Sequence, residues 1–384
     1  MTEPMFWMSV AGVVLAYAGY PAYLVLRRSL DPWPVVPRAW TPPVDVLLVV
    51  HNAGDALEAK VANLQRLDYP AQRLTVHVVC DGCTDATAAV ARRLASGRVR
   101  ATVFAERRGK SACIGDLLPT LTGDVVLFVD VRQTLAPHAL RALTAALADP
   151  SVGAASGELV IRDPTGFAAG VDAYWRYEKA IRRLESATGS MVGATGALYA
   201  ARRQLIGPVP PGLILDDMWI PLSVADAGYR IVAVDDAIAV DHAPPDPAAE
   251  ERRKRRTLSG NYQLLHRLPR LALPGAHPLS LRLWGHKWSR LLVPWLLATA
   301  LASSALLAAA GSRLYLTLFL LQAGAYALAI LGRRSAWLAG RFPPARVAAA
   351  FLSLNASAAL ALGDYLRNPR AHLWQTTRYQ ESGR

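Results

Sequence analysis

Long apolar segments at both ends of the chain limit what it can fold into. The first runs from Met5 to Leu26 without a charged residue and is followed directly by Arg27 and Arg28. A helix of this length, rising about 1.5 Å per residue, crosses a hydrocarbon core of about 30 Å. A cleaved signal peptide carries its basic residues before the apolar run, whereas here they come after it. We therefore predict a permanent transmembrane anchor with Arg27 and Arg28 on the cytosolic side.

Further apolar segments lie near the C-terminus, at roughly 291–310, 314–331 and 347–366. The short turn Gly311–Arg313 joins the first two, so we predict a helical hairpin. The third contains Asn355 and Asp364, and a charged residue inside a span is costly unless it faces other helices or an interface. The sequence leaves open whether this third segment crosses the membrane or lies along it.

The formal net charge of +13 does not by itself indicate nucleic-acid binding. The basic residues are concentrated in the run Arg252–Arg256 and at the ends of the apolar segments. Anionic lipid headgroups or a diphosphate are nearer partners for such runs, and no nucleic-acid-binding motif accompanies them. We therefore expect membrane lipids as partners and no nucleic acid.

The segment from Leu279 to Trp295 carries apolar and aromatic residues at helical spacing. Trp284 and Trp288 fall on one side, while His286 and Arg290 fall on the other. This pattern predicts an interfacial amphipathic helix. The alternative is that these residues form the first turns of the following span, where tryptophans mark the membrane boundary.

A globular segment lies between the anchor and the basic run. Short apolar, β-branched runs alternate there with helix-like stretches, which predicts a parallel sheet covered by helices on both faces. The predicted strands are Val44–Val50, Leu74–Cys80, Val99–Ala105 and Asp124–Val129. The predicted helices are Asp55–Leu67, Thr84–Ala95, Lys110–Leu121 and Pro137–Leu147.

Polar residues follow the predicted strands, at the sheet edge where open α/β sheets bind their ligands. Asn52 follows the first strand, Asp81 the second and Asp130 the fourth. Gly109 and Lys110 begin the third helix. The backbone amides there, the helix dipole and the Lys110 ammonium would together suit a phosphate. Taken singly, each is equally well explained as a helix cap or turn residue. No dinucleotide or P-loop glycine motif follows the first strand, so a different nucleotide ligand is expected.

Several stretches of the chain match a known pattern in order and spacing. They are VDVLLVVHNAGDALEAKVANLQRLDYP, VVCDGCTDAT, RRGKSACIGDLL, VVLFVDVRQTL, VGATGALYAARR and LILDDMWIPLSVADAGYRIV. From Val44 to Gln263 they resemble membrane-bound glycosyltransferases of family 2. The C-terminal part more loosely resembles the membrane region of cellulose, hyaluronan and poly-N-acetylglucosamine synthases. The resemblance implies a Rossmann-like GT-A fold with a mostly parallel sheet, and inverting transfer of a sugar from a nucleoside-diphosphate donor.

The resemblance also assigns roles to individual residues. It implies that Asp81 contacts the base and that Asp130 is the first carboxylate of an Asp-x-Asp metal and diphosphate motif. It places the general base at Asp217, with Asp216 beside it, although a loop capping the next helix would explain one of these two aspartates. The residues assigned to the nucleotide sugar are Asn52, Asp81, Gly109, Lys110, Asp130, Arg132, Asp216 and Arg256.

Small residues in VGATGALY match a family segment that lets the backbone approach the acceptor sugar. The resemblance therefore assigns Gly193, Thr195 and Gly196 to the acceptor. A tight structural turn would have the same composition, so both interpretations stay open.

Two departures from the family pattern bear on the chemistry. Arg132 stands where the second Asp-x-Asp carboxylate is expected, which removes an oxygen ligand from a divalent-cation site. We still expect Mg²⁺ or Mn²⁺, held by Asp130 and His242; alternatively, His242 is structural and Arg132 neutralises the diphosphate directly. Thr257 follows Arg256 where processive synthases carry tryptophan, so polymer synthesis by a single copy is disfavoured.

Together these features predict a multi-pass protein of the inner (plasma) membrane with a cytosolic catalytic domain. We expect a hexosyltransferase that moves a sugar from a UDP-sugar to a lipid-linked or saccharide acceptor, in extracellular polysaccharide or glycolipid synthesis. The alternatives are a processive polysaccharide synthase acting as a homo-oligomer and a catalytically impaired, nucleotide-binding scaffold subunit. The predicted parts are an anchor (1–28), a Pro-rich linker (29–43), the GT-A domain (44–246), basic and interfacial helices (247–290), transmembrane helices (291–366) and a tail (367–384).

Overall fold

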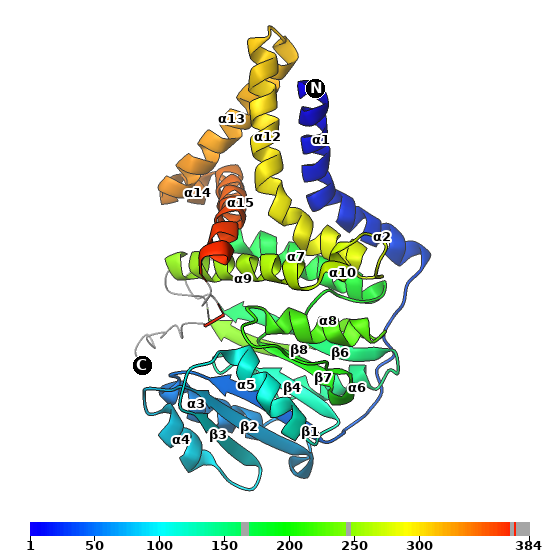
Figure 1. Cartoon of the computed structure of the whole chain (residues 1–384), viewed down its shortest axis with the longest axis vertical. Helices are drawn as coiled ribbons and strands as arrows, with labels where there is room; N and C mark the ends of the chain where they lie inside the picture. Colours follow the sequence, from blue (N-terminus) through cyan, green and yellow to red (C-terminus); the bar gives the residue numbers. More distant parts are fainter. Residues whose placement is uncertain (163–168, 243–246, 369–371, 374–384) are drawn as a thin grey trace. The chain divides into compact units, whose positions relative to one another are not determined.

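The computed structural model describes residues 1–162, 169–242, 247–368 and 372–373 (Figure 1). The chain divides into two compact units, which we call the helical unit and the sheet unit. The helical unit comprises Met1–Leu26, Thr165–Ile181 and Glu250–Arg367. The sheet unit comprises Arg27–Pro164, Arg182–Ala249 and Asn368–Arg384. Most of the predicted tail lies outside the described residues.

The sheet unit is built on one eight-stranded sheet. Its strands are β1 (Val44–Val50), β2 (Leu74–Asp81), β3 (Val99–Phe104), β4 (Val125–Val129), β5 (Thr134–Leu135), β6 (Val152–Arg162), β7 (Leu198–Arg202) and β8 (Arg230–His242). Their order across the sheet is β3-β2-β1-β4-β7-β6-β8-β5. The pairs β3-β2, β2-β1, β1-β4 and β6-β8 are parallel, whereas β4-β7, β7-β6 and β8-β5 are antiparallel.

The parallel half of the sheet confirms the predicted strand and helix alternation. All seven residues of β1 are buried, so both faces of this strand are covered, as its sequence, apolar except for Asp45, indicates. The helices of this half are α3 (Gly54–Gln65), α4 (Thr87–Leu94), α5 (Lys110–Leu117) and α6 (Ala139–Leu147). They begin and end within a few residues of the predicted bounds.

The other half of the sheet, β7-β6-β8-β5, was not predicted. Its antiparallel pairs make the sheet a mixed one. The sequences of β6 (VGAASGELVIR) and β7 (LYAAR) contain many alanines and glycines. Alanine and glycine have low strand propensity, so the strand pattern of the sequence is weak there. The strands form because β7 pairs with β4 and β6 pairs with β8, which are contacts between distant parts of the chain.

The chain crosses from one side of β1 to the other, because β1 lies between β2 and β4. The carboxyl ends of these three parallel strands therefore meet at one edge of the sheet. In open α/β sheets, such a reversal of strand order forms the ligand-binding crevice.

The described residues include four helices long and apolar enough to cross a membrane. They are Thr2–Leu30, Ser280–Ala309, Arg313–Arg334 and Pro343–Arg367. They contain the apolar segments identified in the sequence and indicate a membrane protein. Asp364, the acidic residue that made the last segment ambiguous, forms a bidentate ion pair with Arg255 of α9 (Pro247–Arg267), with N–O distances of 2.9 and 2.6 Å.

The predicted interfacial segment forms the first part of the continuous helical run Ser280–Ala309. Its polar residues His286 and Arg290 are buried. Both contact Glu178 of α7 (Ala169–Ala187), and Lys287 Nζ lies 2.9 Å from the same carboxylate. Ion pairing inside the helical unit therefore accommodates these charges, and Glu178 is a partner that the sequence pattern did not identify.

A buried carboxylate ties together the start of the sheet. Asp45 of β1 accepts a hydrogen bond from His77 Nε2 of β2 at 2.8 Å. Its second oxygen accepts from the amides of Thr122 and Gly123, at 2.9 and 2.7 Å, in the loop before β4. Burial would raise the pKa of Asp45, but the hydrogen bonds from His77 and Gly123 outweigh it and lower the pKa.

We predict that Asp45→Asn destabilises the protein by about 2 kcal/mol or more, because an amide nitrogen would face donors that the carboxylate satisfies. This corresponds to roughly 4–8 °C in melting temperature, measured by intrinsic fluorescence of the detergent-solubilised chain. The difference from wild type should shrink as pH falls through the lowered pKa of Asp45, because protonation removes the carboxylate's advantage.

Glu58→Gln is the matched control, since Glu58 pairs with Arg93 at 2.8 Å while both side chains are exposed. It should change stability by less than about 0.5 kcal/mol. Equal melting temperatures for the two variants would contradict a structural role for Asp45.

Candidate active site

Lys110 brings together two carboxylates that are far apart along the chain. It is the first residue of α5, while Asp130 follows β4 and Asp216 begins α8 (Asp216–Asp226). Its Nζ lies 2.8 Å from Asp130 Oδ1 and 3.3 Å from Asp216 Oδ2. Burial lowers the pKa of Lys110, but the charges of Asp130, Asp216 and Asp217 outweigh it and raise the pKa above its usual value. The side chain is therefore an ammonium ion at neutral pH.

Asp217 belongs to the same cluster. The helix begins at Asp216, so both aspartates lie in its first turn, where the helix dipole favours negative charge. Tyr199 lies buried beside them and stacks on Phe128, with ring centroids 4.5 Å apart. Burial, together with the charges of Asp216, Asp217 and Asp130, raises the pKa of Tyr199 well above its usual value.

The glycine-rich segment predicted to meet the acceptor packs against the start of α8. Ala194 N donates to the backbone oxygen of Asp217 at 2.8 Å. A Cβ at Gly196 would lie 3.0 Å from Asp217 Oδ2, so the missing side chain leaves room for the carboxylate. Thr195 N donates to Ser156 Oγ at 3.0 Å, which fixes the other side of the segment. Gly193, Thr195 and Gly196 therefore lie beside Asp217, and contact with an acceptor stays a prediction.

Asp81 holds the loop that leads to Lys110. It is fully buried, and its carboxylate accepts from the amides of Arg108 at 2.7 Å and Gly109 at 2.9 Å. Gly109 has a φ of 94°, a conformation that favours glycine. The Gly109 amide, which we expected to face a phosphate, is thus engaged by Asp81. A Cβ at this position would also lie 2.8 Å from Cδ2 of His372.

Asn52 joins the ends of β1 and β2. It has a φ of 50°, and its side chain exchanges hydrogen bonds with Thr84, whose amide lies 2.8 Å from Asn52 Oδ1. The neighbouring His51 Nδ1 lies 2.7 Å from the backbone oxygen of Asp81. These contacts shape the rim of the site, and a role for Asn52 in nucleotide binding stays a prediction.

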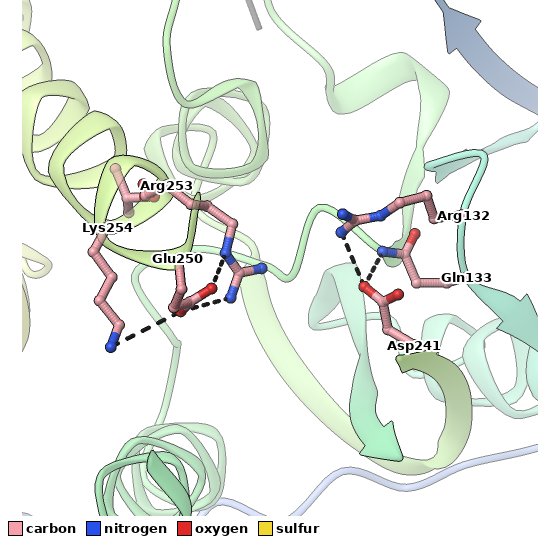
Figure 2. Close-up of polar contacts among 7 residues, drawn as sticks. Arg132, Gln133, Asp241, Glu250, Arg253 and Lys254 are labelled. Carbon is pink, nitrogen blue, oxygen red and sulfur yellow. Dashed lines mark hydrogen bonds and ion pairs between the residues drawn. The ribbon is translucent and has the colours of Figure 1, made fainter. Parts of the chain in front are cut away.

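Arg132 points to a carboxylate far along the chain. Figure 2 shows Arg132 and Gln133 converging on Asp241, with distances of 3.0 and 2.8 Å to the same Asp241 oxygen. Lys60 Nζ donates to the backbone oxygen of Gln133 at 2.7 Å. Burial lowers the pKa of Lys60 to about 8, although the negative charges of Asp130 and Asp241 act to raise it. Asp241 and Lys60 were not identified from the sequence. Asp241 directly precedes His242, which was identified as a candidate metal ligand.

The residues present do not fit the predicted divalent-cation site. Such a cation requires several oxygen ligands, but Asp130 is already paired with Lys110, and Arg132 occupies the second motif position. His242 is exposed at the end of β8, where its amide donates to Asp241. Throughout the part of the chain that the structure describes, no group of three or more His, Cys, Asp or Glu side chains could hold a metal ion.

The basic run belongs to α9 in the helical unit. Figure 2 also shows Glu250 with Arg253 and Lys254, a local cluster within this helix. Arg256 lies on the same helix, and its contact with a nucleotide sugar stays a prediction.

Comparison with known proteins agrees with this fold. N-acetylglucosaminyltransferases are similar: that of Sinorhizobium fredii is 27% identical over 319 residues, which cover 78% of this chain and 77% of the relative. That of Rhizobium leguminosarum bv. viciae is 28% identical over 221 residues, covering 53% of this chain and 52% of the relative.

Among solved structures, the mannosyltransferase PcManGT from Pyrobaculum calidifontis, in complex with GDP-Man and Mn²⁺, is similar with a TM-score of 0.70. It is 26% identical, and the similarity covers 95% of this chain and 99% of that one. The expected GT-A fold is therefore confirmed. A family model described as "Glycosyltransferase like family 2" matches residues 42–260. Since this match spans more than half of the chain, the protein belongs to glycosyltransferase family 2.

Proposed function

We propose that the sheet unit transfers a sugar, with inversion, from a nucleoside-diphosphate donor to an acceptor hydroxyl, with Asp217 as general base. The observation that carries this proposal is the arrangement around Lys110. Its ammonium pairs with Asp130 and Asp216, while the carboxylate of Asp217 lies over Gly196. The Lys110 ammonium can therefore contact the diphosphate of the donor, while the Asp217 carboxylate can accept the proton of the acceptor hydroxyl.

The proposed step is a single displacement. The acceptor oxygen attacks the anomeric carbon and loses its proton to the carboxylate of Asp217. The bond between the anomeric carbon and the diphosphate oxygen breaks on the opposite face, and the electron pair leaves with the nucleoside diphosphate. Inversion follows because only one displacement takes place. Lys110 stabilises the negative charge that develops on the leaving group.

The relatives guide the choice of donor. The N-acetylglucosaminyltransferases among them favour UDP-N-acetylglucosamine for this chain, whereas the structure with GDP-Man makes a guanosine donor the alternative. The candidate membrane helices support an acceptor that is lipid-linked or a saccharide handled at the membrane. We keep the cytosolic face of the inner (plasma) membrane as the proposed site, with an extracellular polysaccharide or glycolipid as the product.

Single residues bear on two other functions. A processive synthase acting as a homo-oligomer would have to work without the tryptophan that Thr257 replaces. A nucleotide-binding scaffold subunit is motivated by Arg132, which departs from the metal motif. Product length and turnover by the purified chain separate these functions from single transfer.

We predict that Asp217→Asn lowers turnover by about 10²- to 10⁴-fold, because the amide cannot accept the acceptor proton. Binding of the nucleoside diphosphate should be retained. The measurement is nucleoside diphosphate release by the full chain in nanodiscs, with UDP-N-acetylglucosamine, UDP-glucose and GDP-mannose as donors.

Asp226→Asn provides the matched control, because Asp226 is an exposed aspartate at the other end of the same helix. It should leave turnover unchanged. Full activity of the Asp217 variant would refute its assignment as base, and a wild type inactive on every donor would favour the scaffold function.

A second prediction concerns the position of the base. In Gly196→Ala, the added methyl group would press on Asp217 Oδ2, and we expect turnover to fall by about 10- to 100-fold through misplacement of the carboxylate. Gly97→Ala is the control, since a Cβ there meets no atom within 4 Å. Unchanged turnover with Gly196→Ala would show that this contact does not position Asp217.

A further inference from the structure

Arg132 stands where the family motif has an aspartate. The site therefore carries more positive charge than the motif, by an amount equal to the charge of one divalent cation. The family motif places a carboxylate with charge −1 at this position, whereas a guanidinium carries +1 at neutral pH. The difference of +2 equals the charge that Mg²⁺ or Mn²⁺ would bring. The same neutralisation of a diphosphate can therefore come from the chain itself.

Arg132 is held in a defined orientation. Its guanidinium lies 3.0 Å from Asp241 Oδ2, and Gln133 Nε2 lies 2.8 Å from the same oxygen (Figure 2). Asp241 is buried, while the Arg132 side chain keeps 28% of its surface exposed. A guanidinium has five N–H donors in one plane, and this geometry matches the oxygens of a phosphate. The anchor reduces the side-chain entropy that binding would otherwise cost.

The surroundings of Asp130 disfavour a bound metal ion. The Lys110 ammonium lies 2.8 Å from Asp130 Oδ1, so a metal would have to displace it or share the carboxylate with it. A second ammonium, that of Lys60, is bound to the backbone oxygen of Gln133 and interacts electrostatically with Asp130 and Asp241. These positive charges offset the attraction of the neighbouring carboxylates for a divalent cation.

We propose that Arg132 and Lys110 together hold the diphosphate of the donor, so that nucleotide binding by this chain does not require a divalent cation. This inference rests on the proposed function, because it names the groups that take the donor in that reaction. Asp241 acts as a positioning residue that orients Arg132.

The test is binding of UDP and GDP to the full chain in nanodiscs, by isothermal titration calorimetry with either EDTA or Mn²⁺. For wild type, the Kd of the bound nucleotide should agree within about twofold under the two conditions. Arg132→Gln should weaken binding by about 10- to 100-fold, because charge-assisted hydrogen bonds to the diphosphate are lost. Added Mn²⁺ should not restore it.

Arg132→Asp distinguishes contact between Arg132 and the diphosphate from a purely structural role of Arg132. This variant recreates the Asp-x-Asp pattern, so binding should be weak in EDTA and recover at least in part when Mn²⁺ is added. Electron paramagnetic resonance of Mn²⁺ should detect tighter metal binding to this variant than to wild type. Arg141→Gln is the matched control, since Arg141 pairs with Asp68 on the exposed surface, and its nucleotide binding should equal that of wild type.

The outcomes separate this inference from the proposed function. Wild-type binding that falls more than about tenfold in EDTA and returns with Mn²⁺ would overturn the inference even if sugar transfer is observed. Metal-independent binding that depends on Arg132 supports it even if no donor is turned over, in which case the proposed transferase activity alone fails. Failure of both nucleotides to bind under either condition overturns it as well. Melting temperatures of the variants identify any loss of affinity that is due to unfolding.

Discussion

The ion pairs of Lys110 with Asp130 and Asp216 are the interaction on which the site depends. Asp130 follows β4, a strand of the parallel half of the sheet, and Asp216 begins the helix α8 between β7 and β8. Carboxylates brought this close repel each other unless a cation lies between them. The ammonium at 2.8 and 3.3 Å provides that cation, and it leaves the neighbouring Asp217 to serve as the proposed base.

Several acidic residues of the sheet unit stabilise structure and position the groups that react. Asp45 and Asp81 are buried and accept backbone amide hydrogen bonds that hold the loops before β4 and α5. Asp241 orients Arg132 in the same way from the end of β8. A buried carboxylate needs such donors, because an unpaired one would lose its hydration without compensation. The substitution at position 132 therefore has a partner already present in the fold, which is what makes metal-free diphosphate binding a chemical option.

Sequence patterns predicted the parts of the fold that depend on local composition. The four strands of the parallel half and their helices were found because valine-rich runs alternate with helical stretches. The alanine- and glycine-rich strands β6 and β7 were missed, because their pairing partners rather than their own propensities place them in the sheet. At the site, Lys110, Asp130, Asp216 and Asp217 were identified and do converge, whereas Asp241 and Lys60 were not identified. Asp81 was identified as a contact of the nucleotide base. The structure shows that it also holds the adjacent loop, and its contact with the base stays a prediction.

The sequence by itself determined the membrane-length helices, the parallel half of the sheet and the family, because each follows from the order and spacing of residues along the chain. Tertiary structure alone decided which charges are paired. Arg132 and Asp241 are 109 residues apart, and Glu178 and Arg290 are 112 residues apart. Electrostatic interaction depends on distance through space and on burial, and neither can be read from positions along the chain until the fold brings the side chains together.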